Sequence, residues 1–231
     1  MINAQILSAI IFKDVSLWLV EPNIYSVYSP GEMPGAYDSF GVSTIYDLVA
    51  CNRLYNWVTL CENALASSSE GWVLDIACGS LAFTAKFYAN YSERPVVLLD
   101  QSLKLLRKGK SRLMKRNGKV PANMVFLHAD ALQLPFKGEI FRTIISLNLL
   151  HCLDDVKTVL KELKRVLTAD GTAALTTLVR NKRWSDSYLN MLARSGVVVP
   201  RSPGHLLSAF DDLDMPVKHQ IKGNLAFINY G

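Results

Sequence analysis

The chain has 231 residues, half of them hydrophobic and 19% charged, which is typical of an ordinary globular domain with one sizeable core. Its four cysteines show neither C-x-x-C spacing nor a nearby histidine pair, so we expect no zinc or other metal site, no disulfide framework, and a reduced, cytoplasmic setting. The apolar run at residues 6–12 is too short to span a bilayer and follows no basic residue, so neither a signal peptide nor a membrane anchor is predicted.

The net charge of +5 comes from one segment. Eight basic residues and no acids lie between Lys104 and Lys119, against 17 basic and 20 acidic residues in the rest of the chain. Such a segment is either an anion-binding or RNA-binding face or the solvated side of a helix whose other side is apolar. Aromatic residues do not interleave the charges, and this favours the solvated helix.

The first 70 residues form an accessory region by their pattern. Residues 1–35 combine apolar stretches with a segment rich in Pro, Gly and Tyr, and we expect them to pack on the core or cover a site. A helical pattern follows at residues 45–65, and a polar loop ends it at residues 67–71. The sequence therefore predicts two units, an accessory and lid region at 1–70 and a core at 71–231.

From residue 71 on, strands and helices alternate. Strands are expected at 72–76, 95–99, 124–128, 141–147 and 172–179, and helices at 81–91, 102–117 and 154–167. Two further helices, at 185–195 and 203–213, precede a hairpin of strands 217–222 and 225–230 around Gly223-Asn224. This alternation predicts an α/β fold: a doubly wound, Rossmann-like, mostly parallel sheet.

The stretch from Gly71 to Leu81, GWVLDIACGSL, is typical of a cofactor-binding turn. It reads as a buried strand, a tight loop of small residues and the start of a helix, so that backbone N–H groups can approach a ligand closely. A dinucleotide fingerprint would place G-x-G-x-x-G here to admit a pyrophosphate. An acid, Asp75, stands at the start of this loop instead and favours a cation.

Acids also end the next two strands. Asp100 and Asp130 follow the second and third strands of the core, and ligands of open α/β sheets bind beyond these carboxyl ends. Asp100 lies 25 residues after Asp75, close to the offset at which an acid meets ribose hydroxyls in nucleotide-binding units. Asp75 or Asp100 alone would more often be a strand-end turn residue or helix cap.

Together these motifs resemble class I S-adenosylmethionine (SAM)-dependent methyltransferases. The turn, D-x-A-x-G-x-L, is similar to the family motif D/E-x-G-x-G-x-G, with Leu81 in place of the last glycine. HADALQLPF resembles G/A-D-A-x-x-L-P-F, and residues 162–171 resemble E-x-x-R-V-L-x-x-G-G. The resemblance covers residues 70–180 and is nearest to small-molecule enzymes that include quinone-biosynthesis C-methyltransferases. It implies a seven-stranded sheet that ends in an antiparallel hairpin.

The resemblance also implies which residues hold SAM and its product S-adenosylhomocysteine. Asp130 would accept from the adenine amino group, and Arg142 stands where that group of enzymes usually has an acid. The expected cofactor-binding residues are Asp75, Ala77, Cys78, Gly79, Asp100, Gln101, Asp130, Ala131, Leu147 and Asn148.

A catalytic residue and an acceptor pocket are less directly indicated. His151 follows the fourth strand and is either a general base, since a neutral imidazole accepts a proton near pH 7, or a structural histidine. Aromatic residues outside the core motifs are candidates for the substrate wall: Tyr37, Tyr46, Trp57, Trp184 and Tyr188.

The sequence therefore predicts methyl transfer from SAM to a small molecule, without distinguishing C-, N- and O-methylation or the oligomeric state. Two alternatives remain. An RNA methyltransferase would use the basic helix at 104–119, although the Asn/Asp-Pro-Pro-aromatic element of base amino-methylation is missing. A non-catalytic SAM-binding module would explain Leu81. A nicotinamide dehydrogenase is disfavoured because the phosphate-cradling glycines are missing.

Overall fold

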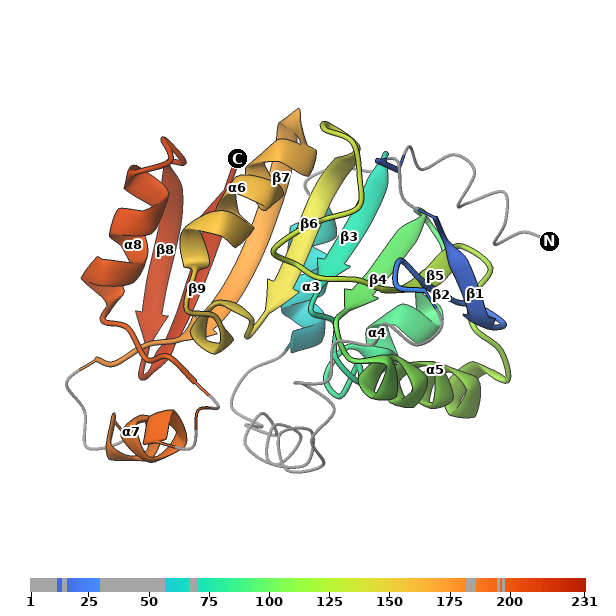
Figure 1. The fold of residues 1–231 in the computed structure, drawn as a ribbon, viewed down its shortest axis with the longest axis horizontal. Coiled ribbons are helices and arrows are strands. Elements are labelled where there is room, and N and C mark those ends of the chain that lie inside the picture. Colours follow the sequence, from blue (N-terminus) through green and yellow to red (C-terminus); the bar gives the residue numbers. More distant parts are fainter. Residues whose placement is uncertain are drawn as a thin grey trace.

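The computed structural model describes residues 12–13, 16–29, 57–66, 70–181, 186–194, 196 and 198–231. Within them, one nine-stranded sheet runs through the molecule in the order β1-β2-β5-β4-β3-β6-β7-β9-β8 (Figure 1). The central strands β3 (Trp72–Ile76), β4 (Val96–Asp100), β5 (Met124–His128), β6 (Phe141–Leu147) and β7 (Leu167–Leu178) are parallel. The predicted mostly parallel, Rossmann-like sheet is confirmed.

Helices cover both faces of the sheet. On one face, α6 (Val156–Val166) and α8 (Pro203–Asp211) belong to one apolar cluster that also contains Leu74 and Ile76 of β3. On the other, α3 (Trp57–Ala66), α4 (Ala85–Asn90) and α5 (Leu103–Asn117) pack against the alternate residue, Val73. Successive strand residues point to opposite faces, so a strand buried on both sides must be apolar throughout, as β3 is apart from its acid.

The helix boundaries follow local chemistry. The Ser102 hydroxyl accepts the Leu105 N–H at 3.2 Å at the start of α5, and Gly118 ends that helix with φ of 70°. Asp155 caps α6 and Ser202 caps α8, whose first residue is a proline. α7 (Asp186–Arg194) lies between β7 and α8 in the chain, and none of the described helices is long and apolar enough to cross a membrane.

The antiparallel end of the sheet is also confirmed. β8 (Val217–Lys222) and β9 (Leu225–Tyr230) form the predicted hairpin around Gly223, and β9 pairs antiparallel with β7. β9 lies between β7 and β8 in the sheet, so the outer strand, β8, comes before the inner strand, β9, in the sequence. The hairpin therefore closes the sheet on the side away from the cofactor-binding turn.

Three features differ from the prediction. Two extra strands, β1 (Trp18–Glu21) and β2 (Ile24–Ser26), extend the predicted seven strands, and β2 runs parallel to β5. The first core helix starts at Ala85 rather than residue 81, and β7 starts at Leu167 directly after α6. The division at residue 70 stays a prediction, since residues 30–56 lie outside the described part.

Candidate functional site

The turn between β3 and α4 alternates left-handed residues. Ala77, Gly79 and Leu81 have φ of 57°, 57° and 53°. A side chain costs about 1–2 kcal/mol in this conformation and glycine costs nothing, which is the physical reason for glycine at such positions. Ala77 and Leu81 therefore adopt the left-handed conformation that glycine would adopt, at a cost in conformational free energy. The helix α4 starts after these residues, at Ala85.

Asp75 is the second-last residue of β3, and its exposed fraction is 2%. Tyr88 of α4 donates its hydroxyl to Asp75 Oδ2 at 2.8 Å, while Oδ1 is buried with no hydrogen-bond partner among the described residues. Burial raises the pKa of Asp75 to about 7, the Tyr88 bond lowers it in part, and the charge of Asp100 raises it. A buried carboxyl oxygen without a donor suits a ligand that brings a cationic or N–H group.

Asp100 ends β4 and holds the turn in place. Its Oδ2 accepts the Gly79 N–H and its Oδ1 accepts the Ser102 N–H, both at 2.8 Å. The carboxyl therefore bridges the left-handed turn and the start of α5. A carboxylate accepts hydrogen bonds only, so this group suits ligands that bring N–H or O–H donors.

A small pocket, partly open to solvent, lies along this turn. Asp75 and the residues of the turn form its floor, and Leu105 of α5 and Leu147 of β6 form its sides. The pocket thus combines one acid, Asp75, with a mostly apolar lining, as small-molecule sites do. It brings together five of the predicted cofactor residues: Asp75, Ala77, Cys78, Gly79 and Leu147.

Asp130 lies one strand further along the same sheet edge. Its Oδ1 accepts the Leu132 N–H at 2.8 Å, and Gln101 Nε2 lies 3.4 Å from its Oδ2. Asp130 therefore binds the backbone of Leu132 and the side chain of Gln101. The predicted residue Ala131 lies between Asp130 and Leu132 in the chain. The carboxyl ends of β4 and β5 thus form one continuous polar edge.

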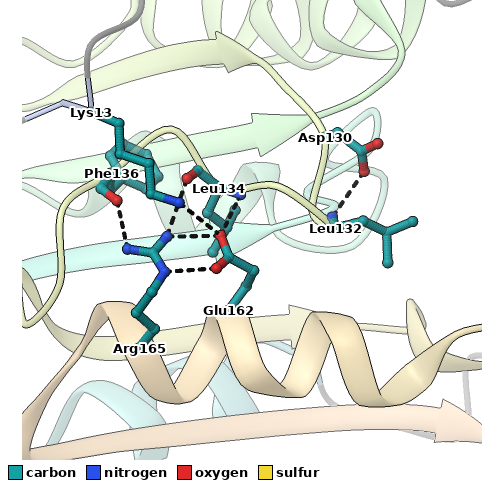
Figure 2. A network of polar contacts seen from close by, with 7 residues as sticks. All are labelled: Lys13, Asp130, Leu132, Leu134, Phe136, Glu162 and Arg165. Carbon is teal, nitrogen blue, oxygen red and sulfur yellow. Dashed lines mark hydrogen bonds and ion pairs between the residues drawn. The ribbon is translucent and has the colours of Figure 1, made fainter.

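The segment after Asp130 is fixed by α6 (Figure 2). Glu162 accepts the Leu134 N–H at 2.7 Å and two bonds from the Arg165 guanidinium, at 2.6 and 2.7 Å. Arg165 also donates to the carbonyls of Leu134 and Phe136. Burial raises the pKa of Glu162, but the Arg165 bonds outweigh it and the pKa is lowered. The E-x-x-R motif therefore acts as a clamp on this loop.

His151 lies in a short 3-10 turn (Leu150–Cys152) after β6 and is 3% exposed. Its Nδ1 accepts the Leu178 N–H at 3.2 Å and lies 3.1 Å from the Thr177 hydroxyl, so Nε2 carries the proton. Burial, then the charge of Arg201, lowers the pKa of His151 to about 3. The geometry fits the structural alternative, and the role as a base stays a prediction.

The remaining predicted residues divide into two groups. Asn148 follows β6 with φ of 65°, and its N–H donates to the Thr176 carbonyl at 2.8 Å beside His151. Tyr37, Tyr46 and Trp184 lie outside the described residues, as do the side chains of Trp57 and Tyr188, so the substrate wall stays a prediction. Within the described part of the chain, no three His, Cys, Asp or Glu side chains gather as a metal site would need.

The basic helix uses part of its charge inside the molecule. Arg107 and Lys110 pair with Glu21 of β1 at 3.2 and 3.0 Å, and Arg112 donates to the Ser80 carbonyl at 2.6 Å and to its hydroxyl. These cations join the edge strand and the turn to α5. The predicted solvated helix face is thus in part a structural one.

Comparison with known proteins agrees with this geometry. Residues 73–171 match the family described as "Methyltransferase domain". The chain is 29% identical to a demethylmenaquinone methyltransferase of Clavibacter sepedonicus, over 72% of this chain and 68% of that protein. It is also 29% identical to a ubiquinone/menaquinone biosynthesis C-methyltransferase of Proteus mirabilis, over 69% and 59%. Across the first curated relatives, the chain spans 35 to 68% of their length.

The fold has solved counterparts. Geranyl diphosphate C-methyltransferase from Streptomyces coelicolor, solved with Mg²⁺, geranyl-S-thiolodiphosphate and S-adenosylhomocysteine, superposes with a TM-score of 0.58 at 11% identity, covering 75% of this chain and 73% of that one. At that identity the likeness concerns the fold alone. The matched domain, the relatives and the sheet agree: this chain is similar to the class I SAM-dependent methyltransferases.

Proposed function

We propose that this chain transfers a methyl group from SAM to a small-molecule acceptor. The observation that carries the proposal is the placement of two buried carboxyls, Asp75 and Asp100, on either side of the left-handed turn that lines the pocket. A phosphate would be repelled by both acids. A ligand with an ammonium group and ribose hydroxyls is complementary to them.

The residues at the sheet edge fit the parts of SAM in order. Asp75 has an unpartnered buried oxygen for the ammonium group, and the Asp100 carboxyl, beside the turn, would accept the ribose hydroxyls. Asp130, which follows the next strand β5, and Gln101, which lies beside it after β4, would face the adenine. When bound, the cofactor supplies a sulfonium methyl that is electrophilic.

The protein's own contribution is to bind and align. The turn and the apolar side chains Leu105 and Leu147 would exclude water from the reacting centre, and a fixed pocket would hold the acceptor at near-attack distance. His151 has its Nδ1 occupied and a low pKa, so in this proposal it orders the end of β7 and takes up no proton.

Small-molecule acceptors are favoured over nucleic acid. Two of the relatives are named for quinone methylation or quinone biosynthesis. In the basic helix, Arg107, Lys110 and Arg112 form contacts within the chain. A phosphate-binding surface keeps such cations available, because each released counterion adds to affinity. The acceptor is therefore expected to be a small molecule.

Calorimetric titration with S-adenosylhomocysteine tests the proposal. We expect wild-type protein to bind it and to ignore NAD, and we expect Asp100→Ala to lose at least tenfold in affinity. Asp211→Ala, which removes an exposed acid at the end of α8, is the matched control and should bind as wild type. A folded wild-type chain that binds no adenosyl ligand would refute the proposal, and binding would justify a screen of quinone-like acceptors.

A further inference from the structure

Strand β2 lies between β1 and β5 and reaches the end of the sheet that carries the proposed cofactor residues. Its residues pair with β5 in parallel register, Ile24 with Phe126 and Ser26 with His128, and the Val27 N–H donates to the His128 carbonyl at 3.2 Å. The chain therefore follows β5 to its carboxyl end, two residues before Asp130. Because this segment lies outside the matched domain at 73–171, it is an addition to the site rather than part of the family motif.

A buried hydrogen-bond relay joins this strand to the residue after Asp100. His128 Nε2 lies 3.0 Å from the Gln101 carbonyl, which can only accept, so Nε2 carries the proton and Nδ1 is an acceptor. The Ser26 hydroxyl, 3.0 Å from Nδ1, must then donate to it, and its oxygen accepts the Tyr28 N–H at 3.0 Å. His128 is 2% and Ser26 3% exposed. The relay fixes the backbone of both Gln101 and Tyr28.

The side chain of Tyr28 lies at the polar edge formed by β4 and β5. Its ring meets the His128 imidazole edge to face, with centroids 4.9 Å apart. Burial raises the pKa of Tyr28, the charge of Asp130 raises it further, and a hydrogen bond with the Gln101 side chain offsets part of this. The hydroxyl is thus next to the Gln101–Asp130 pair, which is where the proposed function puts the adenine.

A second contact holds the same segment on the far side of Asp130. Phe12 forms an antiparallel bridge with Phe136, their rings 5.6 Å apart, and the Lys13 N–H donates to the Pro135 carbonyl at 2.9 Å. The Lys13 ammonium lies 3.6 Å from Glu162 of the clamp (Figure 2). The described part of the N-terminal segment is therefore anchored both before and after the loop that carries Asp130.

We propose that Tyr28 is a cofactor-contacting residue at the base end of the site, held there by Ser26 and His128 as positioning residues. The inference rests on the proposed function. A half-buried aromatic ring beside an amide and a carboxyl is complementary to a purine: the ring can stack on the base while the hydroxyl keeps Gln101 oriented. The N-terminal segment then contributes to adenine binding as a fixed wall.

Binding measurements on matched variants test this role. Tyr28→Leu should weaken S-adenosylhomocysteine by about tenfold, as expected for loss of one base-stacking ring, and 5′-methylthioadenosine by the same factor, since that ligand keeps the adenosine end. Tyr28→Phe should recover most of the affinity, and Ser26→Ala should lose about threefold. Tyr25→Leu, on the same strand but packed toward the core, is the matched control and should bind as wild type.

A spectroscopic readout needs no destabilised variant. In protein labelled with 3-fluorotyrosine, the Tyr28 resonance, assigned with Tyr28→Phe, should shift when either ligand is added, and that of Tyr25 should stay. If the wild-type chain binds S-adenosylhomocysteine while the Tyr28 resonance is unmoved and folded Tyr28→Leu keeps full affinity, the inference is wrong and the proposed function stands. If the wild-type chain binds neither ligand, the proposed function itself fails.

Discussion

The side chain of Leu81 lies directly against α5 at Gly109, where a Cβ atom would come 3.2 Å from Leu81 Cγ. Leu81 is 1% exposed, with φ of 53°, at the position where the family motif has its last glycine. A side chain at this position needs space, and the missing side chain at Gly109 provides it. The departure from the motif and the helix glycine are thus complementary features of one contact.

Gly109→Ala should therefore destabilise the protein although alanine is the better helix former. The new Cβ would also meet Phe126 Cε1 at 3.3 Å, and neither neighbour can yield, since Leu81 sits in a strained turn and Phe126 is fully buried. Overpacking of about 2 kcal/mol exceeds a helix gain of about 1 kcal/mol. Urea unfolding should show a net loss of about 1 kcal/mol.

The matched control for this substitution is Gly204→Ala on α8. A Cβ there meets nothing within 4 Å, so propensity alone should act and stability should stay equal or rise by up to about 1 kcal/mol. The added Cβ of Gly109→Ala would also lie 3.5 Å from the Gly79 carbonyl oxygen of the turn. A shift of Leu81 away from this Cβ would move the turn, so the variant should weaken S-adenosylhomocysteine binding as well. Equal stability changes in the two variants would contradict the contact.

Stability should fall with rising pH on account of Asp75. Its pKa is raised from 3.8 to about 7 in the folded protein, so the folded state holds a proton that the unfolded state releases between these values. The loss amounts to at most about 4 kcal/mol and is complete above pH 7. Asp75→Asn should remove it, so the variant's free energy of unfolding minus that of wild type should increase from pH 4 to 7.

Ligand binding should also change the protonation of Asp75. A cationic ligand group beside Asp75 favours the ionised carboxyl, so binding of S-adenosylhomocysteine should release a proton near pH 6.5 and strengthen as the pH rises through 7. Calorimetry in buffers of different ionisation heat counts that proton. An affinity that is flat from pH 6 to 8 in wild type, and equal in Asp75→Asn, would show that the carboxyl does not meet the ligand.

Most of the fold could be predicted because its signals are local. Apolar runs gave β3 to β6, and the caps Ser102, Asp155 and Ser202 stand where hydroxyl and carboxyl side chains precede helical periodicity. Strand β2 has only three residues, and its partner β5 lies about a hundred residues away in sequence, which no periodicity reveals.

The site was predictable in its acids and less so in its geometry. Asp75, Asp100 and Asp130 carry a pattern, whereas Tyr28 and His128 carry none, because their meeting depends on the register of β2. For His151 the sequence left base and structural roles open. The hydrogen bond from the Leu178 N–H to Nδ1 favours the structural role. Every residue except proline has a backbone N–H, so the sequence could not indicate this bond.

His151 should affect stability in the direction opposite to Asp75. Its pKa is lowered from 6.5 to about 3, so the folded state keeps it neutral, and stability is lost as the pH falls from 6.5 towards 3. His151→Gln should unfold more easily at pH 7 and show less loss on acidification. His205→Gln, at an exposed position of α8, is the control and should leave the acid limb unchanged. An acid limb that is identical in all three proteins would contradict the buried neutral state.

The clamp of α6 on the Asp130 loop should depend on the fork of Arg165. Arg165→Lys keeps the charge but loses the paired bonds to Glu162 and the bonds to two carbonyls, leaving a partly buried carboxylate with poorer donors. We expect a loss of about 2 kcal/mol in urea unfolding.

An exposed ion pair of the same helix provides the comparison. Lys157 and Asp212 lie 2.6 Å apart with side chains 54% and 53% exposed, so Lys157→Ala should cost less than about 0.5 kcal/mol. Because Leu134 and Asp130 belong to one loop, Arg165→Lys should also weaken S-adenosylhomocysteine severalfold while Lys157→Ala does not. Loss of stability without loss of affinity would mean that the loop keeps its path without the clamp, and Asp130 would then owe its position to its own bond with the Leu132 N–H.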